Sequence, residues 1–235
     1  MITTMHGQAA LIVFSTISAK EALLELVPEF EHSSGYKIDI TYAGGPDLAK
    51  RIAGGLQGDL FIGPEDFSDA LLQSGKLLAG SRTAFAHSTT ALAVRADAPR
   101  PDISTPEKLK QTLLAAHAVC YSAGASGLLF VRIAECLGIA EAIAGKRVAP
   151  RAGELTGTVV ARGDADIAVQ QISELLPVAG IQILDPLPAQ LQQPIVYGTS
   201  LFAQALRRDV AQAFVAFLRS APARAVLRAK GLQPA

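Results

Sequence analysis

The sequence predicts an α/β protein, because short strand-like apolar runs alternate with helix-like segments along the whole chain. Its 235 residues, 50% of them hydrophobic, suit one large or two small globular domains. No Pro/Gly/Ser-rich linker divides the chain, so two domains would have to be joined by short strands. We expect open parallel sheets, whose ligands bind beyond the carboxyl ends of the strands.

The first βα unit illustrates the pattern. Residues 10–14 form a continuous apolar run, which is typical of a strand covered on both faces. Ser18 and Glu21 then have the spacing of a capping box before apolar residues at helical intervals. Pro28 falls inside this predicted helix, where we expect a kink.

The alternation continues to the end of the chain. Pro46 opens the second helix at its first position, Thr105 caps a later helix, and Gly138 ends another. Further strands are predicted at 36–42, 59–62, 90–94, 117–121, 167–169, 181–184 and 195–196. Further helices are predicted at 67–72, 128–137, 210–218 and 221–229.

Three polar loops lie where a strand passes into a helix: STIS at 15–18, AGGP at 43–46 and SAGASG at 122–127. The first turn of a helix has unpaired N–H groups and a partial positive charge. Several such turns meeting at one site would bind an anion without any fixed cation. These loops predict a receptor for a small anion.

Composition excludes several partners and compartments. Lys+Arg and Asp+Glu both number 21, so the formal net charge of zero gives no field that would attract nucleic acid or an acidic membrane. No stretch of 18 apolar residues predicts a membrane span, and the N-terminal residues 1–8 lack the features of a signal peptide. We expect a cytoplasmic protein as written, or a periplasmic one whose leader has been removed.

Metal and cofactor sites are not indicated. The four histidines, at 6, 32, 87 and 117, show no ligand spacing. Cys120 and Cys136 could pair in principle, but buried free thiols are the expected state. The SAGASG loop lacks the Lys and Ser/Thr that follow a phosphate loop, and it is not a nucleophile elbow. We therefore expect neither a nucleotide cofactor nor a serine hydrolase.

Four segments together resemble the molybdate-binding family of bacterial ABC importers: LIVFSTISAKEALLELVPEFE, ITYAGGPDLAKRIAGGLQGDLFIGPED, SAGASGLLFVRIAECLGI and GDADIAVQQISEL. The resemblance implies a two-lobed, type II periplasmic-binding-protein fold, with one lobe formed by 1–85 and 194–235 and the other by 86–193. It further implies an oxyanion held in a cleft between the lobes, a monomer, and an importer membrane subunit as partner.

The family's site positions carry over unevenly. Ser18 matches the first serine, Ala125 and Leu155 fall where backbone N–H groups bind, Gly44 and Gly45 replace the second serine, and Gln170 replaces a tyrosine. In a desolvated site, the loss of a hydroxyl that donates to the ligand weakens binding by about 1–3 kcal/mol. The replacement of the serine and the tyrosine therefore disfavours molybdate. The candidate ligand-binding residues are Thr16, Ser18, Gly44, Gly45, Ser122, Ala125, Ser126, Leu155, Thr156 and Gln170.

A second function stays open. VQQISELLPVAGIQILDPLPAQLQ resembles the branch of this fold that contains aconitate isomerase, which implies a tricarboxylate ligand and a proton transfer between its carbons. Such an enzyme needs a positioned acid and base, and His87 or a serine could serve. Arg132 and Arg151 could clamp a carboxylate, whereas Asp59 is expected to fix a loop through backbone N–H groups.

Overall fold

A computed structural model describes residues 10–235, so the predictions about the N-terminal residues 1–8 and His6 lie outside the described residues. The chain forms two compact units. The first comprises residues 10–86 with Tyr197–Ala229 and Gln233–Ala235, and the second comprises His87–Val196 with Lys230–Leu232. The chain leaves the first unit along β4 (Thr83–Ser88) and returns to it along β10 (Ile195–Leu201).

The first unit contains a six-stranded sheet in the order β11-β4-β10-β3-β1-β2. Its remaining strands are β1 (Leu11–Thr16), β2 (Ile38–Ala43), β3 (Leu60–Pro64) and β11 (Gln233–Pro234). Strand β1 pairs in parallel with β2 and β3, but β10 runs antiparallel to β3, with Tyr197 opposite Pro64. The expectation of a purely parallel sheet is therefore wrong, because apolar patterning reports a strand without its direction.

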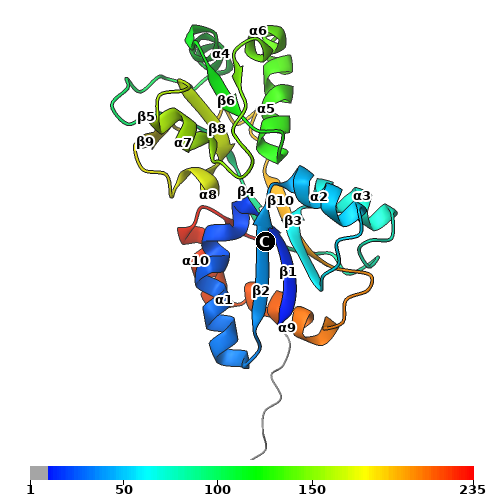
Figure 1. Cartoon of the computed structure of the whole chain (residues 1–235). Helices are drawn as coiled ribbons and strands as arrows, with labels where there is room; N and C mark the ends of the chain where they lie inside the picture. The colour runs from blue at the N-terminus through cyan, green and yellow to red at the C-terminus, as the bar shows by residue number, and fades with distance from the viewer. Residues whose placement is uncertain (1–9) are drawn as a thin grey trace, which may run out of the picture. The chain divides into compact units, whose positions relative to one another are not determined.

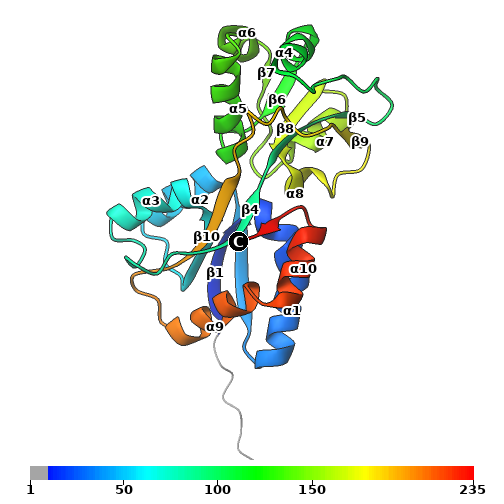
Figure 2. The same cartoon turned by 180° about the vertical axis from the view of Figure 1, so that it is seen from behind.

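Helices cover both faces of this sheet (Figures 1 and 2). One face carries α1 (Lys20–Ser34), α9 (Arg208–Leu218) and α10 (Ala221–Ala229), and the other carries α2 (Gly45–Ala53) and α3 (Glu65–Gln73). The ring centroids of Phe30 in α1 and Phe214 in α9 lie 5.0 Å apart. Phe14 and Phe61 pack with α2 and α3 on the opposite face. Helix α1 continues through Pro28 to Ser34.

The second unit contains a five-stranded sheet in the order β7-β6-β8-β5-β9. Its strands are β5 (Thr90–Arg95), β6 (Val119–Tyr121), β7 (Arg147–Val148), β8 (Ile167–Gln171) and β9 (Ile181–Ile183). Strand β5 is antiparallel to both β8 and β9, whereas β6 is parallel to β7 and β8. This sheet is also mixed.

Two groups of helices enclose the second sheet. One group is α4 (Pro106–Ala115), α5 (Ala125–Cys136) and α6 (Ala140–Ala144), and the other is α7 (Thr156–Ala161) and α8 (Ile172–Leu175). Phe130 and Ile133 of α5 pack on one face, and Val160 of α7 packs with Cys120 on the other. The two apolar faces explain why the three inner strands, β5, β6 and β8, are almost continuous runs of buried residues.

Local signals in the sequence agree with several element ends. Thr105 caps α4, since its Oγ1 accepts a hydrogen bond from Lys108 N at 3.3 Å. Gly138 follows α5 with a positive φ of 68°, as expected of a glycine that ends a helix. Strands β4, β7 and β11 and helices α6, α7 and α8 were not predicted, because each is short or lacks a clear apolar period.

Within residues 10–235, no single helix is long and apolar enough to cross a membrane. Helices α9 and α10 meet the criterion only when taken together across a 65° bend. Their apolar residues, including Phe214, Leu218 and Leu227, are buried in the first unit.

Candidate functional site

Thr16 ends β1 in the first unit and is 3% exposed. Its hydroxyl has no hydrogen-bond partner among the residues that the structure describes. Leaving a buried hydroxyl unpaired costs about 1–3 kcal/mol, so this group is available to a bound ligand or water. The side chain lies on the α2/α3 face of the sheet, since Phe14, two residues earlier, packs there and a Cβ on Gly63 would lie 3.0 Å from Thr16 Cγ2.

Ser18 lies in the short 3₁₀ turn Ile17–Ala19 that links β1 to α1. The predicted capping box is wrong: Ala19 is the N-cap of α1, and no side-chain cap hydrogen bond forms there. The Oγ atom of Ser18 instead accepts a hydrogen bond of 2.8 Å from Tyr197 Oη. Both residues are buried. The inserted 3₁₀ turn delays the start of α1 by one residue, so that Ala19 takes the cap position in place of Ser18.

Tyr197 was missed by the sequence analysis, although it follows the predicted strand at 195–196 directly. It is the second residue after Ile195 in β10 and is fully buried. Its contact with Ser18 joins segments 179 residues apart in the sequence. No local pattern reports such a contact.

Gly44 and Gly45 begin α2, with Gly44 as the N-cap and Pro46 in the first turn. A Cβ on Gly44 would meet nothing within 4 Å, whereas a Cβ on Gly45 would lie 2.6 Å from Cε2 and 2.7 Å from Cδ2 of Phe67. The second polar loop therefore has room for a side chain at Gly44 and none at Gly45. Its exposed donors are backbone N–H groups of the first helical turn.

Tyr42 lies next to this loop on β2, and its buried hydroxyl also has no partner among the described residues. Burial raises the pKa of the Tyr42 phenol to about 12, with a further contribution from the charge of Glu21. The phenol is therefore protonated and able to donate at neutral pH. It was not among the predicted site residues.

In the second unit, the loop 122–127 leads from β6 into α5. Ser122 Oγ accepts a hydrogen bond of 3.1 Å from Gly124 N, and Ala125 is the first residue of the helix. A Cβ on Gly127 would lie only 1.9 Å from the carbonyl oxygen of Ser122, so this position requires glycine. Ser126 is 2% exposed in the same turn. The N–H groups of this turn have no acceptor within the helix.

Gln170 on β8 is hydrogen-bonded to the start of α7. Its Oε1 accepts from Thr156 N at 2.8 Å and from Thr156 Oγ1 at 2.9 Å, and both residues are buried. Leu155 precedes Thr156 as the N-cap of α7. The carboxamide oxygen of Gln170 thus serves the helix terminus, which leaves its Nε2 end as the donor suited to a ligand.

The structure brings the candidates together in two separate sets. Thr16, Ser18, Gly44 and Gly45 belong to the first unit, at the carboxyl ends of β1 and β2. Ser122, Ala125, Ser126, Leu155, Thr156 and Gln170 belong to the second unit, around the carboxyl ends of β6 and β8. All three polar loops follow the ends of strands, as predicted.

The charged candidates lie elsewhere. Asp59 accepts hydrogen bonds from the backbone N–H groups of Ile12, Leu206 and Arg207 at 3.0, 2.8 and 3.0 Å, which is the loop-fixing role expected of it. The side chains of Arg132 and Arg151 are exposed. His87, the first residue of the second unit, has a buried Nδ1 without a partner in the described part of the chain.

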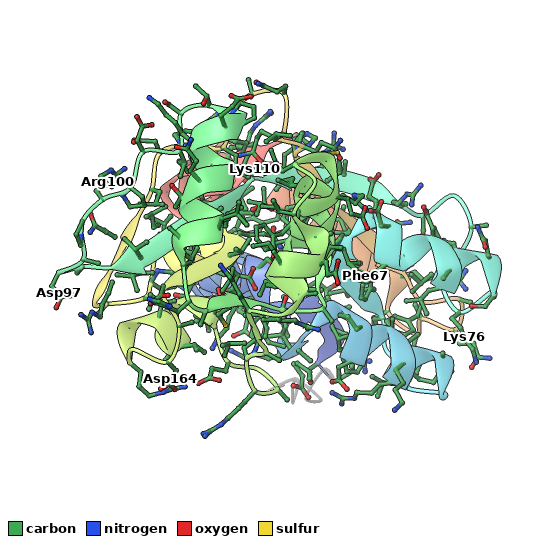
Figure 3. The ribbon with its side chains drawn as sticks, turned by 90° about the horizontal axis from the view of Figure 1, so that it is seen from above. Phe67, Lys76, Asp97, Arg100, Lys110 and Asp164 are labelled. Atoms are coloured by element: carbon green, nitrogen blue, oxygen red, sulfur yellow. The ribbon has the colours of Figure 1, made fainter. Side chains whose placement is uncertain are left out.

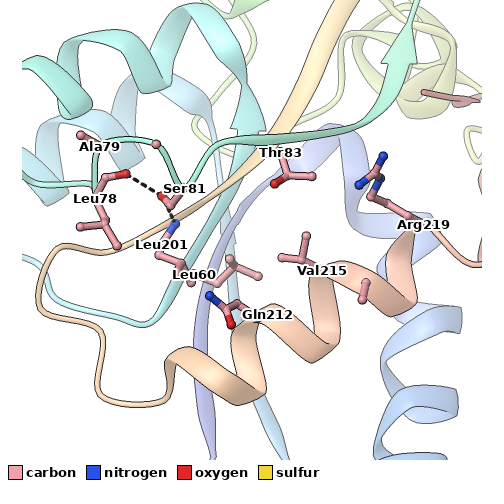
Figure 4. A pocket seen from close by; sticks show the side chains of 11 residues that line it. Leu60, Leu78, Ala79, Ser81, Thr83, Leu201, Gln212, Val215 and Arg219 are labelled. Carbon is pink, nitrogen blue, oxygen red and sulfur yellow. Dashed lines mark hydrogen bonds between the residues drawn. The ribbon is translucent and has the colours of Figure 1, made fainter.

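One pocket of the first unit has a volume of about 430 Å³ and lies between β4, β10 and α9 (Figure 4). Leu60, Leu201 and Val215 line it together with Gln212 and Arg219. None of the candidate donors contributes to it. Over residues 10–235, no three His, Cys, Asp or Glu side chains are grouped in a way that could hold a metal ion.

Two mixed sheets, each flanked by helices and each ending in loops with buried neutral donors, define a type II periplasmic-binding-protein fold. The chain belongs to the family of bacterial extracellular solute-binding proteins, whose model matches residues 11–233. The predicted fold class and the predicted family resemblance are confirmed.

A relative with a known activity is an aconitate isomerase from Pseudomonas sp., 33% identical over 233 residues that cover 95% of this chain and 87% of that protein. The periplasmic molybdate-binding protein of Azotobacter vinelandii has a similar structure, with a TM-score of 0.79, 19% identity and coverage of 94% and 98% of the two chains. The sulfate-binding protein SubI of Mycobacterium tuberculosis H37Rv has a TM-score of 0.79, 16% identity and coverage of 97% and 87%.

Proposed function

We propose that the protein binds a small polycarboxylate through neutral donors from both units. Gln170 carries this proposal. Its carboxamide oxygen is engaged by Thr156, at the position where the oxyanion-binding pattern has a tyrosine hydroxyl. That oxygen is an acceptor, so the Nε2 group of Gln170 remains a donor. Gly44 and Gly45, however, supply no hydroxyl where the same pattern has a serine, which leaves fewer side-chain hydroxyls for a compact tetrahedral dianion in a desolvated site. A longer anion, whose carboxylates are separated by carbon atoms, can instead reach donors that lie further apart than a tetrahedral dianion can span.

The composition of the donor sets supports the same ligand class. Thr16 and Tyr42 have buried hydroxyls without partners, and α2 and α5 begin with unpaired backbone N–H groups. These are neutral donors that act through position and dipole rather than net charge. The 33% identity to an aconitate isomerase, against 19% or less for the oxyanion-binding structures described above, favours an organic anion.

Isomerisation is a second candidate function, which the aconitate isomerase relative favours. A base would remove a proton from the methylene carbon of the bound acid, the double bond would shift, and the proton would return to the former vinyl carbon. The reaction consumes no co-reactant. His87 is the candidate base, because its Nδ1 is buried without a partner among the described residues. Tyr42 is not a candidate base, because its pKa of about 12 keeps the phenol protonated at neutral pH.

Calorimetry with trans-aconitate, citrate, molybdate and sulfate tests the binding proposal. We expect the tricarboxylates to bind at least tenfold more tightly than either oxyanion. Thr16→Val keeps the side-chain shape but removes the hydroxyl, and should weaken tricarboxylate binding about tenfold. Thr158→Val, at an exposed position of α7, is the matched control. Tight molybdate binding with weak tricarboxylate binding would overturn the proposal.

Proton NMR tests the enzymatic candidate. Incubation of the protein with trans-aconitate should produce the cis isomer, and His87→Gln should abolish this without weakening tricarboxylate binding. If trans-aconitate binds but remains unchanged over hours at high protein concentration, the protein is a receptor without this activity.

The family description supports a place outside the cytoplasm. A similar structure, the substrate binding domain of a putative molybdenum ABC transporter from Clostridium difficile, supports a membrane transporter as partner. We propose that the protein acts there as a monomer that delivers its anion. Fractionation of cells that express the full gene, with detection by antibody, locates it. Recovery only from the cytoplasmic fraction would contradict this assignment.

A further inference from the structure

Phe67 lies at the start of α3, and its ring is packed against the start of α2 (Figure 3). The contact is close: a Cβ on Gly45 would lie 2.6 Å from Cε2, 2.7 Å from Cδ2 and 3.3 Å from Cζ of the ring. Real Cβ atoms do not approach aromatic carbons so closely. A side chain at position 45 would therefore require the half-buried ring of Phe67 to move.

This contact lies at the same corner of the sheet as the unpaired hydroxyl of Thr16. Strands β2 and β3 both run parallel to β1, so α2 and α3 begin at the edge where β1 ends. Thr16 points to the face that α2 and α3 cover. The buried hydroxyl, the glycine turn and the aromatic ring thus come from three different elements at the same edge of the sheet.

We propose that Phe67 determines ligand class, by providing an apolar wall for the carbon skeleton of an organic anion beside Gly44 and Gly45, where the molybdate-binding resemblance implies a serine hydroxyl. This inference rests on the proposed polycarboxylate function. A serine at position 45 would require the Phe67 ring to move from its place on α2. The pair therefore acts as a selector: the site offers an apolar surface while the ring stays there, and a hydroxyl at position 45 only after the ring has moved.

The two kinds of ligand respond differently to this exchange. Molybdate and sulfate present only oxygen atoms at their surface, so a ring in contact with them removes water without offering a hydrogen bond. A tricarboxylate has carbon atoms between its carboxylates, and their burial against an aromatic ring is favourable. The edge of the ring is also electropositive, which tolerates a carboxylate nearby.

A double-mutant cycle on the full chain tests the proposal with trans-aconitate and molybdate as probes. Phe67→Ala should weaken trans-aconitate binding about tenfold and change molybdate affinity less than about threefold. Gly45→Ser alone should weaken trans-aconitate binding, because the ring must move. Gly45→Ser combined with Phe67→Ala should bind molybdate at least tenfold more tightly than Phe67→Ala does, and the two changes should be non-additive.

Leu72→Ala is the matched control, since Leu72 lies on the same helix and packs on the core beside α2. It should lower stability without changing the ratio of the two affinities. Each variant is compared at a temperature at which its circular dichroism spectrum is that of wild type.

Two negative results differ in meaning. If the wild type binds trans-aconitate but Phe67→Ala leaves the affinity ratio unchanged, the selector proposal is wrong and the proposed function stands. If the wild type binds no polycarboxylate, both are wrong.

Discussion

Ser18 and Tyr197 form a buried hydroxyl pair whose atoms are 2.8 Å apart. Tyr197→Phe removes one partner and should lower the free energy of unfolding by about 1–2 kcal/mol. It should also weaken ligand binding, because the orientation of Ser18 is no longer fixed. Urea denaturation and calorimetry measure the two effects. Tyr36→Phe, at a half-buried position, is the control, and an equal effect of both substitutions would contradict the prediction.

Ser18→Gly separates binding from helix capping, although loss of the hydroxyl that accepts from Tyr197 should lower the free energy of unfolding by about 1–2 kcal/mol. Since Ala19 and not Ser18 is the N-cap of α1, loss of the Ser18 side chain removes no cap. We expect helicity by circular dichroism to be unchanged and anion affinity to fall about 5- to 150-fold, as for the loss of one buried hydrogen bond. Unchanged affinity, measured at a temperature at which the variant has the circular dichroism spectrum of wild type, would show that Ser18 does not contact the ligand.

Asp59 connects three backbone segments of the first unit and is 2% exposed. Asp59→Ala would leave three N–H groups without their acceptor, so we expect a loss of about 3 kcal/mol or more in the free energy of unfolding. Asp39→Ala, at an exposed position of β2, should change it by less than about 0.5 kcal/mol. Chemical denaturation of both variants checks the difference.

At the scale of elements, β2 and β6 each bury a group that ionises only at high pH. Burial raises the pKa of the Cys120 thiol from 9.0 to about 12 and that of the Tyr42 phenol from 10.0 to about 12. The unfolded chain ionises first, so stability is constant below about pH 9 and falls as the pH rises from 9 to 12. Urea denaturation across this range should show a shallower decline above pH 10 for Tyr42→Phe.

The two thiols should differ in reactivity because their elements place them differently. Cys120 is fully buried in β6, whereas Cys136 is exposed at the end of α5, and both are free. A thiol reagent at pH 8 should modify Cys136 within minutes and Cys120 only after unfolding. Mass spectrometry of the labelled peptides measures both rates, and simultaneous labelling would mean that the second sheet opens readily.

At the scale of the whole molecule, we expect both donor sets to bind the same anion. Receptors of this class close on their ligand by a hinge motion. Saturating trans-aconitate should therefore decrease the radius of gyration measured by small-angle X-ray scattering, and Thr16→Val should shift this change to higher ligand concentration. Binding without any change in the radius of gyration would contradict a closing mechanism.

Sequence alone determined the elements that carry their own signals. Helix α10 was predicted with its observed bounds, Thr105 and Gly138 mark helix ends as expected, and the three polar loops follow strands. These features follow from residues within about four positions of one another, through apolar period, capping and glycine φ. The fold class followed from their alternation.

Only the tertiary structure decided the direction of β5 and β10, the partner of Ser18 and the reason for Gly45. Antiparallel pairing of β10 with β3, the bond between Tyr197 and Ser18, and the packing of Phe67 on α2 each join segments far apart in the chain. Local patterns cannot report such contacts, because the free energy of each depends on packing that forms only when the whole unit folds. The sequence predicted which residues form the candidate site. The role of each residue depends on side chains from distant segments that only the fold brings into contact with it.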